Sequence, residues 1–419
     1  MNNQSQQKQE AVETIQRKLL GRKLNYKEIY NLMDQISHHR LSNILTTYFV
    51  AASFKEGFST NELFYLTKAM VETGTKLNFE GIVADKHSIG GLPGTRTTMI
   101  IVPIIAAAGF TIPKTSSRAI TSPAGTADVM ECFSKVTFST NEIKKIVTQV
   151  GGCIVWGGHL GIAPADDIII RVEEPLSFES FDKVVLSIMA KKIAVSTNHL
   201  IIDIPVGKTM KVHHLTDAEK IGKKFISLGE RFGIKVIIDI NRTEEPAGSG
   251  IGPILEGIDV LKVLEQKKDR PLALEERSLN LAGKLLDICY QDAKINKNGL
   301  KEAKKLLQNK SALKKFHEII KAQNGNNQIN SESIKIKSKL TEINAEITGK
   351  IKRLNIHNLS LISKLLGAPN DKFAGIFLKK RINDKIEKHE PILTFYSNNS
   401  YNLKEAKITL KNFPIYSYE

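Results

Sequence analysis

The chain has 419 residues, of which 41% are apolar and 25% charged, and its 60 Lys and Arg exceed its 44 Asp and Glu by 16. This is an ordinary globular composition, and it excludes collagen-like, disulfide-scaffold and wholly disordered proteins. Because a domain usually holds about 100–200 residues, the length predicts two or three lobes that each bury a core.

The first patterned segment of the chain is helical. Residues 12–73 carry apolar side chains at the i, i+3, i+4, i+7 spacing of amphipathic helices, for example over residues 41–52. Gly57 predicts the end of one helix, and the cluster STNE at residues 59–62 predicts the N-cap of the next. We expect residues 1–75 to form the first part of a helical lobe.

The pattern changes at Gly81 to a short apolar run, IVA, which is followed by DKHSIGG and a long apolar helix over residues 97–108. A strand, a glycine-rich turn and a helix in this order indicate an α/β arrangement. The runs at residues 154–156, 200–204 and 236–240 are typical of buried parallel strands, and a helix is expected over residues 217–232. We expect residues 76–160 and 199–335 to form a larger α/β lobe.

The remaining regions complete the predicted fold. Helical residues 163–194 interrupt the α/β pattern, so residues 161–198 are expected to return to the helical lobe, with candidate hinges at the crossings. Residues 323–333 are polar and predict a linker or exposed loop. Runs at residues 374–378 and 392–396 predict paired strands. The predicted class is α/β: a discontinuous helical lobe, a larger mixed α/β lobe and a C-terminal α+β subdomain over residues 336–419.

No segment predicts a membrane span. The most apolar stretch, residues 99–110, contains Pro103 and is far shorter than the roughly 20 residues that a span needs. The first ten residues are polar and lack the apolar core of a secretory signal. Cys132, Cys153 and Cys289 are widely spaced, as is typical of reduced thiols. We expect a cytoplasmic protein with no membrane partner.

The positive charge does not by itself predict a nucleic-acid partner. Many lysines lie in the C-terminal half, for example at residues 301–305 and 335–339, with the spacing of solvated helix or strand faces. No RNA-binding aromatic run, zinc-finger spacing or basic-zipper pattern accompanies them. A nucleic-acid partner is therefore not expected.

The segment DKHSIGGLPG, residues 85–94, is the first with chemistry. Glycines let a backbone approach a ligand, amides at a helix N-terminus attract anions, and Lys86 and Ser88 add a cation and a hydroxyl. These features predict a phosphate cradle, although the order of residues differs from a nucleotide-hydrolysing P-loop. The alternative is a structural turn before a buried helix.

The second segment is residues 115–126, TSSRAITSPAGT. Its hydroxyls and its guanidinium suit the lining of a polyanion site better than a core strand. The alternative is a polar loop that caps the next helix.

The third segment combines Arg171 with SIMAKK at residues 187–192. Ser187 and Lys191 are four residues apart and share a helix face, where a hydroxyl and a cation could hold a planar heterocycle. Surface lysines at this spacing are common, and that remains the alternative. The glycines at residues 247–253 do not match a dinucleotide fingerprint, and the histidines lack metal-ligand spacing, so we expect neither cofactor nor metal.

Together, DKHSIGGLPG, IPKTSSRAITSPAGTADVME, APADDIIIRVEEPLS and SIMAKK, in this order, resemble the thymidine phosphorylase and AMP phosphorylase family. The resemblance implies a helical lobe and an α/β lobe that close on each other, usually in a homodimer. It also implies that inorganic phosphate, as co-substrate, splits an N-glycosidic bond of a nucleoside or nucleotide without any other cofactor.

The resemblance also implies roles for individual residues. Phosphate would be held by Lys86, Ser88, Gly91, Thr98, Ser116 and Thr126. The base or nucleotide would be bound by Ser117, Arg118, Thr121, Ser122, Arg171, Ser187, Lys191 and Lys211. The catalytic residues would be His87, Arg171, Glu179 and Lys191, with Glu179 at the position of a proton-donating aspartate in AMP-using members.

Some positions bear on specificity and assembly. The TSSRAIT wording and Pro93-Gly94 resemble the AMP phosphorylase branch, and Ile168 stands where thymidine phosphorylases often carry a tyrosine. AMP-using relatives usually have a longer N-terminal segment linked to higher assembly, so a dimer is expected here. Asn383 and His389 replace glycines that commonly flank a C-terminal turn, and His tolerates left-handed geometry poorly, so we expect a rebuilt turn.

Our first hypothesis is therefore a pyrimidine nucleoside phosphorylase of the thymidine phosphorylase type, giving a free base and a (deoxy)ribose 1-phosphate. The second is an AMP phosphorylase, which would give adenine and ribose 1,5-bisphosphate. A third is a non-catalytic, nucleic-acid-binding descendant that uses the positive charge. Anthranilate phosphoribosyltransferase is a more distant alternative. Its glycine loop normally continues into an acidic residue, whereas Gly90 and Gly91 here are followed by Leu92 and Pro93.

Overall fold

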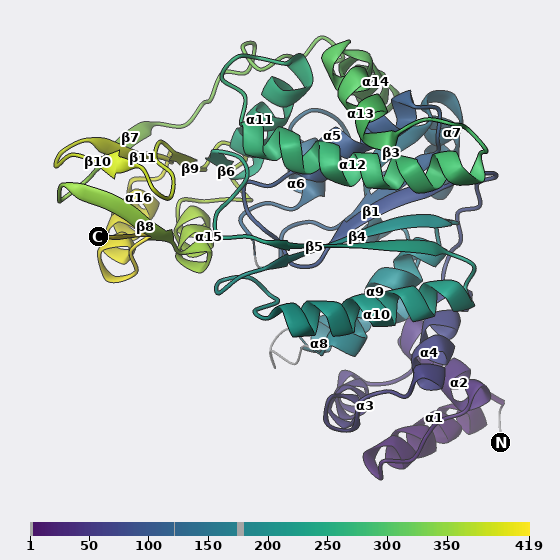
Figure 1. The fold of residues 1–419 in the computed structure, drawn as a ribbon. Helices are drawn as coiled ribbons and strands as arrows, with labels where there is room; N and C mark the ends of the chain where they lie inside the picture. Colours follow the sequence, from purple (N-terminus) through teal and green to yellow (C-terminus); the bar gives the residue numbers. More distant parts are fainter. Residues whose placement is uncertain (1–2, 121, 174–179) are drawn as a thin grey trace. The chain divides into compact units, whose positions relative to one another are not determined.

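The computed structural model describes residues 3–120, 122–173 and 180–419 (Figure 1). The chain forms two compact units, and each is assembled from segments that are far apart in the sequence. One contains Met1–Asp85, Gly157–Leu200 and Glu219–Ile237, and the other contains Lys86–Trp156, Ile201–Ala218 and Ile238–Glu419. Each unit is described below by itself.

The first unit is mainly helical. Its helices are α1 (Asn3–Leu19), α2 (Tyr26–Ser37), α3 (Asn43–Glu56), α4 (Thr60–Glu72), α8 (Pro164–Glu173), α9 (Phe181–Ile193) and most of α10 (Leu215–Arg231), with a short 3₁₀ turn at Gly157–His159. The discontinuous helical lobe expected from the sequence is confirmed. The sequence did not indicate that α10 groups with it.

Local capping residues explain where these helices begin and end. Gly57 ends α3 with φ of 66°, a conformation that glycine adopts without a Cβ clash. At α4 the Ser59 hydroxyl accepts from the Glu62 amide at 3.3 Å, while the Glu62 carboxylate accepts from the Ser59 amide at 2.9 Å. This reciprocal capping box satisfies two of the free helix donors. The predicted helix end and N-cap are confirmed.

Three strands, β1 (Ala84–Ser88), β4 (His199–Val206) and β5 (Lys235–Arg242), form a sheet in the order β1-β4-β5. The chain passes from one unit to the other within each of them. β1 corrects one expectation, because Asp85–Ser88 lies within the strand rather than in a turn after it. These polar residues can lie in a strand because Lys86 hydrogen-bonds Thr97 and Ser88 hydrogen-bonds Asp203.

The second unit has a helical layer around short strands. β2 (Ile112–Ser116) and β3 (Gly152–Trp156) pair in parallel, in register from Ile112 opposite Gly152 to Ser116 opposite Trp156. The other elements of this part are α5 (Thr97–Ala107), α6 (Thr126–Met130), α7 (Thr140–Val150), β6 (Gly250–Ile251), α11 (Pro253–Glu265), α12 (Leu272–Asp292), α13 (Gly299–Gln308) and α14 (Ser311–Ala322).

The longest apolar segment of the chain forms α5, whose residues from Thr97 to Ala106 are all buried. A helix that is apolar on every side needs neighbours around it, and α5 contacts α11, α12, α13 and α14. In the described part of the chain, no helix combines the length and hydropathy that crossing a bilayer would require.

Residues 323–333 form a loop between α14 and the C-terminal strands, as expected, but its first residue is not exposed. The Gln323 side chain is buried and hydrogen-bonds both the amide and the carbonyl of Ile154, at 2.8 and 2.9 Å. The loop is therefore fastened to strand β3 rather than being a free linker.

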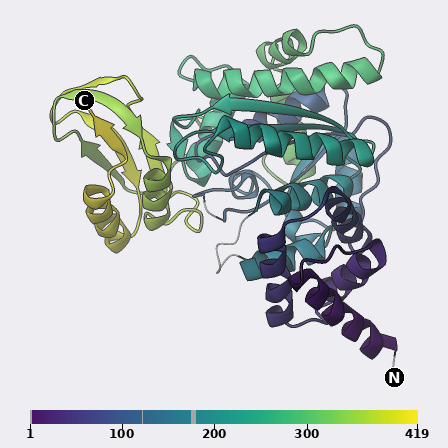
Figure 2. The same cartoon turned by 60° about the horizontal axis from the view of Figure 1, so that its bottom comes forward.

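The C-terminal subdomain contains two antiparallel sheets, of order β6-β9-β11-β7 and β10-β8-β12, and two helices. Figure 2 shows α15 and α16 beside each other against these strands. Its core includes Ile351, Leu359, Ile376 and Phe395, all fully buried. The elements are β7 (Leu340–Asn344), β8 (Gly349–Leu354), α15 (Ile356–Leu365), β9 (Gly375–Leu378), β10 (Lys385–Ile386), β11 (Pro391–Tyr396), α16 (Ser400–Asn412) and β12 (Tyr416–Tyr418).

The C-terminal turn keeps left-handed geometry at both non-glycine positions. Asn383 has φ of 76° and His389 has φ of 70°, and the His389 amide donates to the Ala345 carbonyl at 2.8 Å. The expected paired strands on either side of this turn are confirmed as β9 and β11. His389 thus adopts the left-handed conformation that histidine tolerates poorly, and a rebuilt turn relative to the family stays a prediction.

Candidate functional site

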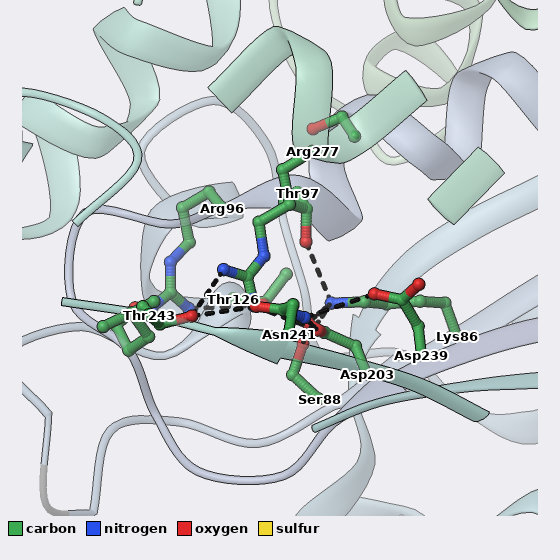
Figure 3. A network of polar contacts seen from close by, with 12 residues as sticks. Lys86, Ser88, Arg96, Thr97, Thr126, Asp203, Asp239, Asn241, Thr243 and Arg277 are labelled. Carbon is green, nitrogen blue, oxygen red and sulfur yellow. Dashed lines mark hydrogen bonds and ion pairs between the residues drawn. The ribbon is translucent and has the colours of Figure 1, made fainter. Parts of the chain in front are cut away.

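The predicted phosphate residues Lys86 and Ser88 lie two residues apart on β1 and therefore on the same face of the strand. Lys86 Nζ donates to Thr97 Oγ1 at 2.9 Å and to the Ser88 hydroxyl. Figure 3 shows both side chains directed into a cluster of polar groups. The hydroxyl that accepts from Lys86 is that of Thr97, and the role of its neighbour Thr98 as a phosphate ligand stays a prediction.

Asp203 on β4 is the carboxylate at the centre of this cluster. Its Oδ2 accepts from the Ser88 hydroxyl at 2.6 Å and lies 3.6 Å from Lys86 Nζ. Burial raises the pKa of Asp203, but the charges of Lys86 and Arg277 outweigh burial and hold that pKa below its usual value. The carboxylate is therefore ionised and neutralises part of the buried positive charge.

The ammonium group of Lys86 is in an unusual environment. Burial, together with the charges of Arg277 and Arg96, lowers the pKa of Lys86 to about 8, against the attraction of Asp203. A cation that has lost its water shell and is only partly neutralised is well suited to attract an anion.

Arg96, just before α5, contacts the loop that follows β1, residues 89–94, which we call the glycine loop. Its Nε pairs with Glu256 at 2.5 Å, its Nη2 donates to the Leu92 carbonyl at 3.2 Å, and its Nη1 reaches the Thr126 hydroxyl at 3.4 Å. Burial raises the pKa of Glu256, although Arg96 opposes the shift. Through Arg96 the predicted ligand Thr126 becomes part of the cluster around the loop.

The second predicted segment packs against the same loop. A Cβ on Gly91 would lie 3.0 Å from the Ser122 hydroxyl, so any larger residue there would press against Ser122. Ser122 donates to the Ala124 carbonyl at 2.9 Å, and Ser116 donates to the Val155 carbonyl at 3.3 Å. These two hydroxyls thus bond the backbone of their own segment and of β3.

Arg118 has protein partners of its own. Its guanidinium makes two hydrogen bonds to Glu131, at 2.6 and 2.7 Å, and one to Asp128 at 3.2 Å, and it stacks 5.0 Å from the Trp156 ring centre. The hydrogen bonds to Glu131 raise the pKa of Arg118 above its usual value. Its assignment to the nucleotide stays a prediction, as does that of Ser117.

The third predicted segment lies in the helical unit. On α9, Ser187 donates to Asp166 at 2.7 Å, and Lys191 pairs with Asp166 at 2.9 Å and with Asp167 at 3.3 Å. Burial lowers the pKa of Lys191, but the two carboxylates outweigh burial and raise it above its usual value. Ser187 and Lys191 therefore share Asp166 as a partner, and Lys191 carries a full positive charge.

Other predicted residues have different surroundings. Arg171 is exposed on α8. Burial raises the pKa of Asp167 above its usual value, and the charges of Lys191 and Arg171 oppose this shift. His87 is half-buried on β1. Lys211 lies against the glycine loop, because a Cβ on Gly90 would be 3.1 Å from the Lys211 Cβ. Thr121 and Glu179 lie outside the described residues.

The sequence analysis missed most of the polar residues that surround Lys86 and Ser88. These are Arg96, Thr97, Asp203, Asn241, Thr243 and Arg277. Only Asp203 had a visible signal, because a single carboxylate within a buried apolar strand needs partners. Over residues 3–120, 122–173 and 180–419, no group of three or more His, Cys, Asp or Glu side chains is placed to hold a metal ion.

Comparison with protein families gives a match along most of the chain. Residues 80–313 match the α/β domain and residues 12–74 the helical bundle domain of a glycosyl transferase family. Residues 350–415 match the pyrimidine nucleoside phosphorylase C-terminal domain. The chain belongs to the thymidine phosphorylase and AMP phosphorylase family. The family resemblance seen in the motifs is thereby confirmed, and the chain is a glycosyltransferase-family phosphorylase.

Individual relatives cover most of this member. AMP phosphorylase 1 of Archaeoglobus fulgidus is 40% identical over 95% of the chain and 78% of its own length. A Bradyrhizobium diazoefficiens protein named "Putative thymidine phosphorylase" is 43% identical over 93% and 74%. AMP phosphorylase of Methanococcus maripaludis is 41% identical over 96% and 79%.

A solved structure supports the fold. Anthranilate phosphoribosyltransferase from Thermus thermophilus superposes with a TM-score of 0.62, at 16% identity, over 74% of this chain and 99% of that one. At this identity the likeness concerns architecture alone. It agrees with a helical bundle joined to a larger α/β domain, so the predicted fold class is confirmed.

Proposed function

We propose that this family member catalyses phosphorolysis of a nucleoside 5′-monophosphate, with AMP as the first candidate. The products would be adenine and ribose 1,5-bisphosphate. Two of the three relatives described above bear the name AMP phosphorylase, and each is about 40% identical over nearly the whole chain. This reverses the order of the two hypotheses that the sequence suggested.

The observation that carries the choice of a 5′-monophosphate is the position of Lys211 against Gly90 of the glycine loop. The loop follows directly after Lys86 and Ser88, so the stem of the Lys211 side chain lies beside the segment that follows the residues expected to hold inorganic phosphate. Two separate cations suit two separate phosphate groups, one on each substrate.

The expected reaction is a single displacement at C1′ of the sugar. A phosphate oxygen forms the C1′–O bond while the C1′–N bond breaks, and the electron pair of that bond leaves with the base. Lys86 and Ser88 would orient the phosphate. Lys191, which its two aspartates keep charged, would stabilise the negative charge on the base together with Arg171. Such catalysis depends on preorganised charge rather than on a covalent intermediate.

Two members of the predicted catalytic set would assist the departing base. His87, next to Lys86 on β1, would contact it, and Glu179 would supply a proton. For AMP, protonation of the ring would prevent a full negative charge from developing as the bond breaks.

Thymidine or uridine phosphorolysis is the second candidate. It is supported by the match of residues 350–415 to the pyrimidine nucleoside phosphorylase C-terminal domain and by the Bradyrhizobium relative. Ile168 counts against this second candidate. It is buried on α8 and apolar, whereas the tyrosine that thymidine phosphorylases often carry at this position has a hydroxyl that could hydrogen-bond the base.

The deciding experiment is release of the free base from AMP, CMP, adenosine, thymidine and uridine, followed by chromatography with and without inorganic phosphate. Phosphate-dependent release from the monophosphates but not from the nucleosides would support the proposal. Release from thymidine or uridine alone would establish the second candidate. No release from any substrate, with a salt-sensitive gel shift of nucleic acid, would favour a non-catalytic protein.

Lys211→Met provides the matched test of the 5′-phosphate. We expect it to raise KM for AMP at least about tenfold, since loss of one charge-assisted contact is worth roughly 1.5–3 kcal/mol. Lys208→Met removes an exposed lysine of the same loop and should leave KM unchanged. Equal KM values for both variants would contradict the role of Lys211.

The resemblance also leads us to propose a homodimer. Light scattering coupled to gel filtration measures the mass directly. A mass of one chain, 46.6 kDa, at the concentration of the assay would contradict it.

A further inference from the structure

Helix α12 carries two cations that face strand β5. Arg277 and Lys284 are seven residues, about two turns, apart and therefore lie on the same side of the helix. Lys284 pairs with Asp239, and Arg277 Nη1 donates to Thr243 Oγ1 at 3.1 Å. None of the motifs recognised in the sequence includes this helix.

Arg277 belongs to a closed ring of hydrogen bonds. Its Nη2 donates to Asp203 Oδ1 at 2.9 Å. The Asn241 side-chain amide donates to the same oxygen at 2.9 Å, and the Thr243 hydroxyl donates to Asn241 Oδ1 at 2.8 Å. Together with the contact from Arg277 to Thr243, these bonds return to their starting point, as Figure 3 shows.

The two oxygens of Asp203 have separate tasks. Oδ1 is held by Arg277 and Asn241, whereas Oδ2 accepts from Ser88 and lies 3.6 Å from the Lys86 ammonium group. Rotation of the carboxylate would break both pairs of contacts at once. The ring therefore fixes the plane of the carboxylate, and the carboxylate in turn holds the two groups expected to bind phosphate.

The Arg277 side chain also has one feature that is unfavourable for stability. Its Nε is buried and has no hydrogen-bond partner among the described residues. A buried donor without a partner is unfavourable, so the guanidinium is not placed for maximal hydrogen bonding. Its placement instead satisfies Asp203 and Thr243.

We propose that Arg277 is a positioning residue of the phosphate site, which orients Asp203 and through it Lys86 and Ser88. The inference rests on the proposed phosphorolysis only for the identity of the anion, inorganic phosphate. Arg277 itself need not touch phosphate.

The arrangement has an electrostatic consequence for Lys86. The charged groups that face its ammonium are Asp203 from β4, Arg277 from α12 and Arg96 from the start of α5, while Lys114 on β2 donates to its backbone carbonyl. Arg277 and Arg96 lower the pKa of Lys86, and Asp203 raises it. Removing Arg277 should therefore raise this pKa, and neutralising Asp203 should lower it.

The test compares Arg277→Met with Arg277→Lys and Asp203→Asn, with Arg270→Met as the control. Arg270 precedes the same helix and pairs with Glu275, away from the cluster. The measurement is kcat/KM for inorganic phosphate at saturating nucleotide from about pH 7 to 10, a range that spans the pKa of Lys86.

We expect Arg277→Met to raise KM for phosphate at least about tenfold at pH 7 with a smaller change in kcat, as expected for lost orientation of a binding group. Its alkaline decline should move to higher pH, and that of Asp203→Asn to lower pH. Arg277→Lys should recover part of KM and keep the decline near its original position, because the charge remains.

Opposite displacements of the two declines cannot result from general destabilisation. If Arg277→Met has the KM and pH profile of Arg270→Met, the inference is wrong. If Arg277→Met does not fold, Arg277→Lys decides, since a KM and pH profile identical to those of the unmodified enzyme would also contradict the inference.

The inference can fail separately from the proposed function. Calorimetric titration of the free protein with inorganic phosphate needs no turnover. Weaker phosphate binding by Arg277→Met than by Arg270→Met would support the positioning role even if no nucleotide is cleaved, and equal binding would overturn it.

Discussion

Lys86 is buried beside one carboxylate and two arginines, and burial lowers its pKa to about 8. The ammonium form attracts phosphate, so we expect kcat/KM for phosphate to fall as the pH rises through about 8. A pH profile at saturating nucleotide measures this directly. A profile that stays flat to about pH 10, near the usual pKa of a lysine, would contradict it.

The same shift affects stability with a defined sign. Because the folded-state pKa of Lys86 lies below its ordinary value of 10.5, the unfolded chain binds more protons between these two pH values. This group therefore destabilises the fold below pH about 8, and the penalty disappears as the pH rises toward 10.5.

Lys86→Ala should nearly abolish turnover and leave the fold intact, because it removes the main charge opposing phosphate. Steady-state kinetics and circular dichroism test the two parts of this prediction. Lys145→Ala, which truncates an exposed lysine on α7, is the control. If Lys86→Ala retained the original kcat/KM for phosphate, the site would be wrongly assigned.

His389 has a backbone conformation that is unfavourable for any residue with a side chain. Its φ of 70° is left-handed, a conformation that costs an L-residue roughly 1–2 kcal/mol relative to glycine. We expect His389→Gly to stabilise the protein by about 0.5–1 kcal/mol in thermal or urea unfolding, after allowing for the greater freedom of glycine when unfolded. An unchanged or lower stability would show that the imidazole makes a compensating contact.

Helix α9 and strand β1 are joined by a buried ion pair between Lys192 and Asp85, 2.6 Å apart. Both side chains are almost inaccessible to solvent, and each is adjacent in sequence to a predicted site residue, Lys191 or Lys86. Adjacent residues on a helix or strand point in different directions. One residue of each adjacent pair thus joins the two elements, and the other is the residue with a predicted role in the site.

We expect Lys192→Met to destabilise the protein by about 3–5 kcal/mol, since the buried Asp85 carboxylate would lose the cation that pairs with it. Adding Asp85→Asn should restore part of this loss. Unfolding in urea measures both effects, with Lys223→Met on the exposed face of α10 as the control. Additive losses in the double variant would mean that the two side chains are not coupled.

Predicted elements were accurate where the signal was local. The Ser59 cap of α4 and the apolar α5 were visible in the sequence because both depend on neighbours a few residues away. β1 was placed too early because polar DKHS resembles a turn when its partners are unknown. The contacts that allow these residues in a strand come from Thr97 and Asp203.

The net charge of +16 belongs to the chain as a whole. A positive protein attracts anions over distances that salt shortens, from a Debye length of about 30 Å at 0.01 M to about 8 Å at 0.15 M. At saturating phosphate, kcat/KM for AMP should therefore fall several-fold over this range of salt, and that for adenosine or thymidine should change less. Equal decreases for charged and neutral substrates would contradict electrostatic steering.

The sequence by itself determined the family, the fold class and most residues expected to bind substrates. Short motifs, helix caps and apolar runs carry that information because each depends on residues close together in the chain. Only the tertiary structure decided which cation meets which carboxylate. Arg277 and Asp203 are 74 residues apart, on a helix and a strand whose contact follows from packing. No local pattern encodes that pairing, so the contacts by which Arg277 and Asp203 position Lys86 could not be predicted.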